Sequence, residues 1–349
     1  MPHVWHVMLS PKLGGIEQMF LYDTRALIEQ NWRVTAIIHP RAKIADKIPE
    51  NVEIIRLNST KLWWPPTILQ QRKLLAAEKP DVIFSHGARA RRWAAAFWKI
   101  PHVIMLHRHR YKGIAKATRI LCVNRTMMIE AKQQGIPEDK LIYFPNFLPE
   151  IPAEIVSKTP AKIPVIGFLG RLKPEKGADI LLEAVALLRA RNVEVKILLA
   201  GSGPEEQALR ALCQKLQLQD YVQFLGWCDN VEENFFPKID LLCVPSRWES
   251  FGLVILQSFA CSVPVVATNS AGAQDLIAHE KNGWLSNANP EALAERLSQA
   301  LSNVENWPGI ISTAFAEVEK FTMAKQGARL SKILLSASKR TYSVFAVAE

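Results

Sequence analysis

The chain has 349 residues, about twice the size of an ordinary domain, and its 49% apolar and 22% charged residues are enough to bury two hydrophobic cores. No apolar run approaches the roughly 20 residues of a membrane-spanning helix, and the N-terminus lacks the pattern of a secretory signal. We therefore expect a cytoplasmic protein, or one peripheral to a membrane. The five cysteines show no CxxC spacing, which argues against a zinc or disulfide framework.

The formal net charge of +10 is concentrated in the first half of the chain. Residues 1–160 hold 24 Lys and Arg against 13 Asp and Glu, whereas residues 161–349 hold 19 against 20. A basic half suggests an anionic partner such as lipid head groups, a phosphorylated glycolipid or nucleic acid. A basic face that only keeps the protein soluble is the alternative. Because the sequence shows no helix-turn-helix, zinc spacing or ribonucleoprotein motif, we expect no nucleic-acid partner.

The first half predicts an α/β domain with a mainly parallel sheet over residues 1–158, because strand-like runs alternate with segments long enough for helices. The runs cover residues 3–9, 33–38, 52–57, 82–85, 103–106 and 120–123. The pair Gly14-Gly15 lies between the first run and a helical pattern at 18–30, where glycine lets the backbone approach a ligand. It is not GxGxxG and no GKS or GKT follows, so dinucleotide and P-loop sites are disfavoured.

Two further features of the first half carry charge near strand ends. His107 follows the apolar run at 103–106; a histidine there is more often structural, but this one would open onto the same edge of the sheet as the glycine pair. Residues 88–99 predict an amphipathic helix, with apolar residues at 90, 93, 94 and 97 and arginines at 89, 91 and 92. Two interpretations explain this pattern equally well. The helix packs on the sheet and its arginines are merely solvated, or its basic face is turned to an acceptor or a membrane.

The second half predicts another α/β domain over residues 159–325, after a proline-rich stretch typical of a linker. Its strand-like runs cover residues 165–169, 195–200, 222–226, 239–244, 263–267 and 284–285. Helical patterns follow at about 178–191, 253–261 and 290–302, and residues 322–349 predict a last helix with a polar tail.

Three loops of this second domain follow strand-like runs and precede helices. Residues 170–177 (GRLKPEKG) carry Arg171 and Lys176, residues 201–204 read GSGP, and residues 245–252 (PSRWESFG) carry Glu249. Such loops at the carboxyl ends of parallel strands bind anions, because helix N-termini present free N–H groups and positive partial charge. Two fixed cations there suit a diphosphate, although solvated surface charges would give the same pattern.

The motifs as a set resemble the family-4 retaining glycosyltransferases, including those that build bacterial lipopolysaccharide and other cell-envelope glycans. In chain order they are Gly14-Gly15-x-Glu17, Asp81-Val82, His86-Gly87, His107, Pro145-Asn146, Gly170-Arg171-Leu172, Lys176-Gly177, Gly201-x-Gly203-Pro204, Phe224-Leu225-Gly226, Pro245-Ser246-Arg247-x-Glu249-x-Phe251-Gly252 and Gly272. The resemblance implies the GT-B fold, in which two Rossmann-like domains with parallel sheets face each other across an interdomain cleft. Residues 1–158 would bind the acceptor, residues 159–325 the nucleotide sugar, and a helix within 326–349 would cross back to the first domain.

The resemblance also implies roles for individual residues in a retaining, metal-independent transfer of a hexose-type sugar, with a UDP-sugar favoured as donor and no cofactor. Arg171 and Lys176 resemble the pair that neutralises the donor diphosphate, Glu249 the carboxylate that binds sugar hydroxyls, and His107 the histidine near the reacting centre. The implied donor-binding residues are Gly14, Gly15, Gly170, Gly201, Gly203, Ser250, Phe251, Gly252, Leu253 and Gln257. Candidate acceptor-binding residues in the basic half are Glu17, Arg89, Arg92, Arg108, His109 and Arg110. No DxD motif occurs, so no metal is expected.

Gln257 is the main departure from the family pattern, which has a second carboxylate eight residues after the first. A neutral amide accepts one hydrogen bond and donates another, so we expect weaker or altered binding of the nucleotide ribose. This departure keeps open a catalytically weakened GT-B binding or partner protein, and a GT-B epimerase or phosphorylase is a further alternative. For the transferase we expect a saccharide or glycolipid acceptor and a basic domain against an anionic membrane, on the cytoplasmic face of the inner membrane.

Overall fold

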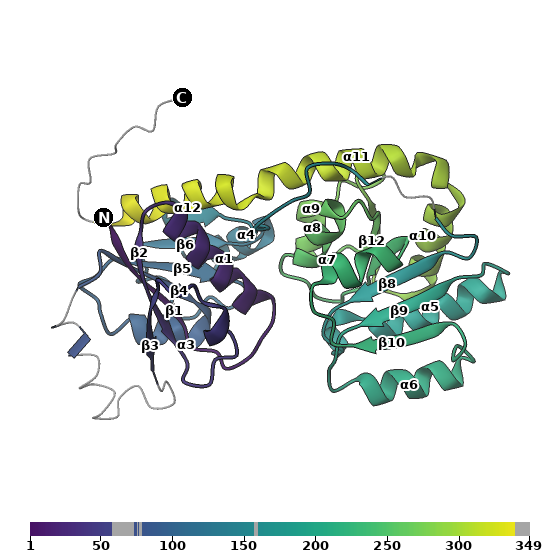
Figure 1. Ribbon diagram of the computed structural model, residues 1–349, viewed down its shortest axis with the longest axis horizontal. Coiled ribbons are helices and arrows are strands. Elements are labelled where there is room, and N and C mark those ends of the chain that lie inside the picture. Colours follow the sequence, from purple (N-terminus) through teal and green to yellow (C-terminus); the bar gives the residue numbers. More distant parts are fainter. Residues whose placement is uncertain (58–72, 75, 77–78, 157–159, 339–349) are drawn as a thin grey trace. The chain divides into compact units, whose positions relative to one another are not determined.

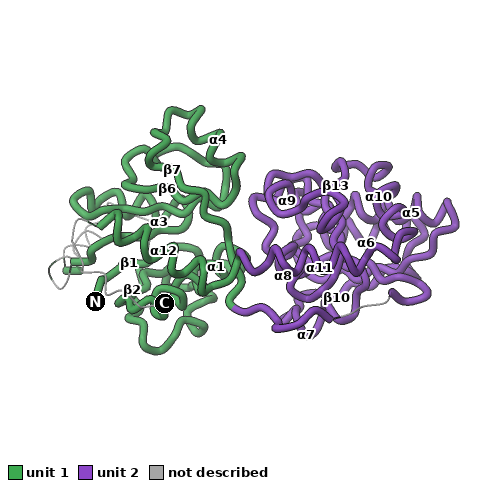
Figure 2. The backbone as a smooth tube through the Cα atoms, turned by 90° about the horizontal axis from the view of Figure 1, so that it is seen from above, with its two compact units in different colours: residues 1–149, 321–349 green, residues 150–320 purple. Residues whose placement is uncertain are grey.

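The computed structural model describes residues 1–57, 73, 74, 76, 79–156 and 160–338 (Figure 1). The chain forms two compact units, which Figure 2 shows in separate colours. Unit 1 comprises residues 1–149 together with the chain from Phe321 on, and unit 2 comprises residues 150–320. The change of unit after Pro149 comes earlier in the chain than residue 158, and the segment that returns to unit 1 begins before residue 326. Residues 339–349, predicted as a polar tail, lie outside the described residues.

Unit 1 is built on a seven-stranded sheet in which all neighbouring strands pair in parallel, in the order β3-β2-β1-β4-β5-β6-β7 (Figure 1). The strands are β1 (His3–Met8), β2 (Arg33–Ile38), β3 (Glu53–Arg56), β4 (Val82–His86), β5 (His102–Leu106), β6 (Arg119–Cys122) and β7 (Leu141–Tyr143). Because β1 and β4 are buried on both faces, they read as apolar runs rather than alternating patterns. The strand order reverses between them, and ligands of open α/β sheets bind at the carboxyl ends of strands at such a switch point.

The helices that the structure describes in unit 1 are α1 (Gly15–Glu29), α3 (Gly87–Ala94), α4 (Arg125–Gln133) and α12 (Met323–Ala337), with short 3-10 turns η1 (Ala45–Lys47) and η2 (Glu138–Lys140). Helix α12, from the far end of the described chain, packs beside α1 (Figure 1). Gly327 allows this close approach, since a Cβ atom there would lie 3.0 Å from that of Ala26. The indole Nε1 of Trp32 also donates to Ser331 Oγ at 2.8 Å, so this last helix completes the core of unit 1.

Unit 2 contains a second parallel sheet, of six strands in the order β10-β9-β8-β11-β12-β13. The strands are β8 (Val165–Leu169), β9 (Lys196–Ala200), β10 (Val222–Gly226), β11 (Leu241–Val244), β12 (Val265–Thr268) and β13 (Trp284–Ser286). The helices are α5 (Ala178–Ala190), α6 (Glu206–Lys215), α7 (Val231–Asn234), α8 (Leu253–Ala260), α9 (Ala271–Leu276), α10 (Pro290–Ser302) and α11 (Trp307–Val318). The 3-10 turns are η3 (Pro174–Lys176), η4 (Phe236–Lys238), η5 (Val304–Asn306) and η6 (Glu319–Phe321), the last of which ends at the first residue of the returning segment. The switch point of this sheet lies between β8 and β11.

The helices differ from the sequence expectation at several ends. Helix α1 begins at Gly15 rather than residue 18, because the glycine pair forms its N-terminus. Helix α3 ends at Ala94 rather than residue 99, and Arg91, expected on its solvated face, is instead buried with its guanidinium donating to the carbonyl of Arg110. Elements α4, β7 and α11 were not predicted. None of the helices in the described part of the chain is long and apolar enough to cross a membrane.

Candidate active site

Two motifs 73 residues apart meet at the switch point of unit 2. Lys176 lies in the loop after β8 and Glu249 in the loop after β11, and these strands are neighbours in the sheet. The Lys176 ammonium donates to the Glu249 carboxylate, with side chains 27% and 14% exposed. A partly buried cation and carboxylate thus lie together where an open α/β sheet binds its ligand.

The loop that carries Glu249 is held by bonds to its neighbours. Arg247 donates twice to the Asp179 carboxylate, at 2.7 and 2.6 Å, and once to the carbonyl of Pro174 at 3.0 Å. Burial alone would raise the pKa of Asp179, but the hydrogen bonds and charge of Arg247 outweigh burial, so its pKa is lowered. The Glu249 carbonyl accepts from Gly272 N at 2.9 Å. Arg247 therefore acts as a bracket between the two loops, and its place in the motif has a structural reason.

Several motif glycines allow the loops to touch each other. A Cβ atom on Gly201 would overlap the carbonyl oxygen of Gly170, and one on Gly203 would overlap that of Leu172. Gly177, in the left-handed region at φ 67°, would overlap the carbonyl oxygen of Pro245 in the same way. Gly201 and Gly203 were predicted to bind the donor, and this stays a prediction. The contacts that demand glycine in the structure are with neighbouring backbone.

The other candidate donor-binding residues of unit 2 surround the start of α8. Gly252 adopts φ 88° and precedes Leu253, the first helical residue, with no side chain capping the helix. Its uncapped N–H groups suit an anionic ligand. Phe251 is buried and its backbone packs against Gly272, whereas Ser250 and Arg171 are half-buried beside these loops.

Gln257 has an acidic partner that the sequence did not indicate. Its side-chain Nε2 donates to Glu232 Oε1 of α7 at 2.9 Å. Glu232 is exposed and Gln257 half-buried, so the carboxylate remains accessible beside the amide. A carboxylate thus lies next to the position where the family pattern expects one, supplied by a residue 25 positions earlier in the chain.

The candidates of unit 1 lie at the carboxyl ends of β1 and β5. Gly14 is the N-cap of α1 and Gly15 its first residue, and a Cβ atom on Gly15 would meet open space, so this backbone is accessible to a ligand. Glu17 is buried and accepts from Ser10 Oγ at 2.6 Å, which gives it a role inside the loop. His107 is 8% exposed, and its Nε2 lies 2.9 Å from His86 Nδ1.

Four candidate acceptor-binding arginines remain on the surface of unit 1: Arg89, Arg92, Arg108 and Arg110. His109 lies between the last two, and its Nδ1 is 2.6 Å from Glu130 Oε2, which also accepts from the Tyr111 hydroxyl at 2.6 Å. Its imidazole therefore anchors the loop to α4, while the flanking arginines stay in solvent.

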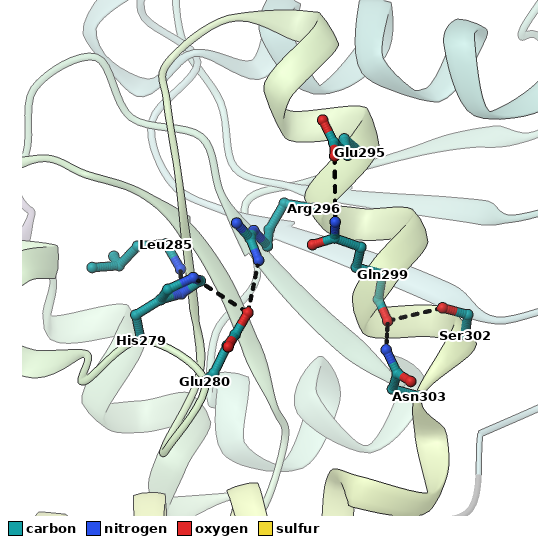
Figure 3. A network of polar contacts seen from close by, with 8 residues as sticks. All are labelled: His279, Glu280, Leu285, Glu295, Arg296, Gln299, Ser302 and Asn303. Carbon is teal, nitrogen blue, oxygen red and sulfur yellow. Dashed lines mark hydrogen bonds and ion pairs between the residues drawn. The ribbon is translucent and has the colours of Figure 1, made fainter.

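Two hollows of unit 2, of about 310 and 910 Å³, contain none of the candidate site residues. The smaller is lined by the residue that follows β12, by the end of β13 with the residue after it, and by α10, including Arg296. Figure 3 shows a polar network whose residues line one or the other of these hollows in part; in it Arg296 donates to Glu280 at 3.1 Å and His279 Nδ1 accepts from Leu285 N at 3.0 Å. These bonds join the turn before β13 to α10, so the network has a structural explanation.

Comparisons with known proteins establish the family. Residues 13–149 match the family model of Glycosyltransferase Family 4, and residues 153–308 match that of Glycosyl transferases group 1. The chain belongs to the family-4 glycosyltransferases and has the GT-B fold, as its motifs predicted. It is 30% identical to the lipopolysaccharide core biosynthesis glycosyltransferase LpsE of Rhizobium meliloti, over 84% of this chain and 87% of that protein.

Two other comparisons define how far the likeness extends. An uncharacterized glycosyltransferase of Methanocaldococcus jannaschii is 32% identical over 49% of this chain, a match that spans 45% of that protein. Among solved structures, Anabaena HepE in complex with UDP and glucose superposes with a TM-score of 0.82 at 19% identity, covering 96% of this chain and 100% of that one. At that identity the superposition shows the shared fold.

The loop contacts lead to a first prediction, for Gly201→Ala. The added methyl group would overlap the Gly170 carbonyl, so we expect unit 2 to lose about 1–3 kcal/mol of stability from overpacking, measured by urea unfolding. Gly226→Ala is the matched control, because Gly226 also has positive φ (70°) but open space around its Cβ position. The control should lose only the left-handed strain of about 1 kcal/mol. Equal losses in both variants would contradict the overlap.

Proposed function

We propose that this protein is a retaining glycosyltransferase that moves a sugar from a nucleoside diphosphate donor, UDP-sugar in the first instance, to a saccharide or glycolipid of the cell envelope. Family membership supports glycosyl transfer. The complexes of HepE with UDP, with UDP and glucose, and with UDP-glucose support the donor, and the likeness to LpsE supports an acceptor of the lipopolysaccharide core type.

The pairing of Lys176 with Glu249 is the observation that carries the proposal. A nucleotide sugar presents an anionic diphosphate next to neutral hydroxyls, and this pair presents a cation next to a hydrogen-bond acceptor. In the free protein each side chain neutralises the other. When the donor binds, the diphosphate provides Lys176 with an anionic partner and frees Glu249 to accept hydrogen bonds from sugar hydroxyls.

The chemistry requires stabilisation of the departing nucleoside diphosphate. As the bond between the sugar and the phosphate breaks, negative charge grows on the leaving oxygen, and fixed cations at Arg171 and Lys176 lower the free energy of that transition state. In this proposal no side chain acts as nucleophile: the acceptor hydroxyl attacks the face that the diphosphate leaves, and a donor phosphate oxygen takes its proton. The two side-chain cations fulfil the role that a metal ion has in other transferases, so the proposed reaction is independent of metal.

The acceptor is assigned to unit 1, at an anionic membrane surface on the cytoplasmic side. The exposed arginines Arg89, Arg92, Arg108 and Arg110 support this assignment, together with Trp98, whose side chain is 80% exposed after the end of α3. Arginine binds phosphate in bidentate geometry and exposed tryptophan suits the interface of a bilayer. His107 is assigned to the donor sugar near the reacting centre.

Nucleotide binding provides a direct test. Isothermal calorimetry with UDP, GDP, ADP and CMP should show tightest binding of UDP, and Arg171→Ala should weaken it by roughly tenfold to a hundredfold, because a charge-assisted hydrogen bond of about 1.5–3 kcal/mol is lost. Glu249→Ala should affect UDP-sugar more than UDP. Arg191→Ala, at the far end of α5 and exposed, is the control and should bind normally.

The same purified proteins test whether the reaction occurs, whether it retains the anomeric configuration and whether it needs a metal ion. Folded protein that binds no nucleotide would remove the transferase proposal and favour a non-catalytic partner protein. If UDP binds, NMR of the product should show the donor's anomeric configuration, and activity should survive EDTA. An inverted product would contradict the retaining mechanism.

A second test concerns Gln257 and Glu232. Restoring a carboxylate alone, in Gln257→Glu, replaces a 2.9 Å hydrogen bond by the repulsion of two like charges, so the two side chains should move apart and UDP affinity should not improve. In Gln257→Glu/Glu232→Gln the pair is exchanged, and UDP should bind at least as tightly as to the natural pair. Calorimetry of both variants checks this, and tighter binding by the single variant would show that Glu232 contributes nothing to the site.

Membrane association is the third test. Arg89→Glu/Arg92→Glu should abolish sedimentation with anionic liposomes and leave UDP affinity unchanged, because electrostatic attraction amounts to about 1 kcal/mol per basic residue near the surface. Arg191→Glu/Lys215→Glu makes the same change of charge on exposed residues of unit 2 and should sediment like the natural protein. Retention of liposome binding by the first variant would exclude this face.

A further inference from the structure

Three buried histidines lie in a row at the switch point of unit 1. His6 belongs to β1, His86 ends β4, and His107 follows β5, so neighbouring strands bring together residues that are 80 and 21 positions apart. Thr24 of α1 lies at the inner end of the row. His107, at the outer end, is the member that the proposed reaction uses, while nothing above assigns a role to the other three.

The four side chains form a continuous chain of hydrogen bonds. Thr24 Oγ1 is 2.9 Å from His6 Nδ1, His6 Nε2 is 2.8 Å from His86 Nε2, and His86 Nδ1 is 2.9 Å from His107 Nε2. At its inner end the Thr24 hydroxyl donates to the carbonyl of Phe20 at 2.8 Å. Every contact has the length of a normal hydrogen bond.

One donor at the inner end fixes the direction of all the others. Because Thr24 gives its only proton to a backbone carbonyl, it must accept from His6 Nδ1–H. Burial lowers the pKa of His6 and of His107 to about 3 and that of His86 well below its usual value, so each ring is neutral and carries a single N–H. His6 Nε2 then accepts from His86 Nε2–H, and His86 Nδ1 accepts from His107 Nε2–H. His107 is left with Nδ1 as an acceptor.

Aromatic packing prevents the inner rings from turning over and exchanging their nitrogens. His6 is stacked against Phe20, with ring centroids 4.0 Å apart, and against Phe84 at 5.0 Å. His86 meets the ring of Phe84 edge-on at 4.7 Å and stacks on His107 at 5.2 Å. Two rings that cannot turn transmit the direction set by Thr24 to His107.

Asp23 is a buried titratable group beside this chain of hydrogen bonds. Its carboxylate lies 3.6 Å from His86 Nε2, and neither of its buried oxygens has a hydrogen-bond partner among the described residues. Burial raises the pKa of Asp23 well above its usual value, so its carboxyl group is neutral and does not draw a second proton onto His86.

His6, Asp23 and His86 also lie close enough to be considered as metal ligands, with their ligand atoms within 4.8 Å of one another. A tetrahedral zinc ion with bonds of 2.0–2.1 Å would separate two imidazole nitrogens by about 3.3 Å. The observed 2.8 Å between His6 Nε2 and His86 Nε2 is shorter and matches an N–H···N hydrogen bond. The geometry therefore favours a shared proton over a metal ion.

We propose that Thr24, His6 and His86 form a positioning relay that holds His107 in its Nε2–H tautomer and so presents Nδ1 as a hydrogen-bond acceptor at the carboxyl edge of the sheet. The group it would receive is a donor O–H, and no described residue occupies Nδ1. The assignment of that O–H to a sugar hydroxyl rests on the proposed function. The tautomer of His107 rests only on the hydrogen bonds of the row.

The test is long-range ¹H–¹⁵N NMR of the full-length protein labelled with ¹⁵N-histidine. His107 Nδ1 should have the chemical shift of an unprotonated nitrogen, and Thr24→Ser, which keeps the hydroxyl, should preserve it. Thr24→Val keeps the side-chain volume but removes the acceptor for His6, so His107 should become a mixture of tautomers. His102 of β5 is the internal control. Its Nε2 lies 2.7 Å from Ser85 Oγ of β4, outside the row, so its ¹⁵N chemical shifts should stay unchanged.

Three results would overturn the relay. The first is a protonated His107 Nδ1 in the natural protein, and the second is a single His107 tautomer in Thr24→Val that thermal unfolding shows to be folded. The third is stoichiometric zinc that is coordinated by the Nε2 atoms of His6 and His86. If the natural protein transfers sugar, Thr24→Val should lower kcat about fivefold to tenfold with Thr24→Ser near normal, the effect of one hydrogen bond. Absence of transfer in a protein whose tautomers are as expected would reject the proposed function and leave the relay intact.

Discussion

The close approach of loops at the carboxyl edge of the six-stranded sheet is the constraint on which the site of unit 2 depends. At Gly177, Gly201 and Gly203 the carbonyl oxygen of another loop occupies the space of a side chain. Three segments that are far apart in the chain are thereby packed into one layer. The charged side chains of Lys176 and Glu249 extend from this layer, so the backbone positions that carry them are fixed. A site on a fixed backbone needs little reorganisation when a ligand binds.

Charge in the two units is arranged for different purposes. In unit 2 the important charges are paired and local. The pair of Lys176 with Glu249 is partly buried and keeps its strength in salt, whereas the pair of Arg247 with Asp179 is more exposed and relies on its two parallel hydrogen bonds. In unit 1 the exposed arginines Arg89, Arg92, Arg108 and Arg110 are solvated, so they act over a Debye length and weaken in salt. The first arrangement suits recognition of one small anion, and the second suits attraction to an extended anionic surface.

The parallel sheets could be predicted from sequence because their inner strands are buried on both faces and therefore read as apolar runs. The residues of the motif loops could be identified as well, since strand, glycine loop and helix follow one another in the chain. The purpose of the glycines could not be predicted, because a sequence does not show whether a ligand or a carbonyl occupies the space. Glu232 beside Gln257 and the row from Thr24 to His107 were also missed, since such pairs arise only when the strand order is known.

The return of the chain to unit 1 has a consequence for its synthesis. Leu148 N donates to the carbonyl of Phe321 and its own carbonyl accepts from Met323 N, both at 2.9 Å, so the point where the chain leaves unit 1 is bonded to the point where it comes back. Helix α12 then buries Leu330 and Leu334 in unit 1. On the ribosome, unit 2 is complete in sequence before this helix emerges. Unit 1 therefore begins synthesis first but cannot finish folding before unit 2 has been made, and the surface of α1 with Trp32 stays uncovered until α12 has left the ribosome.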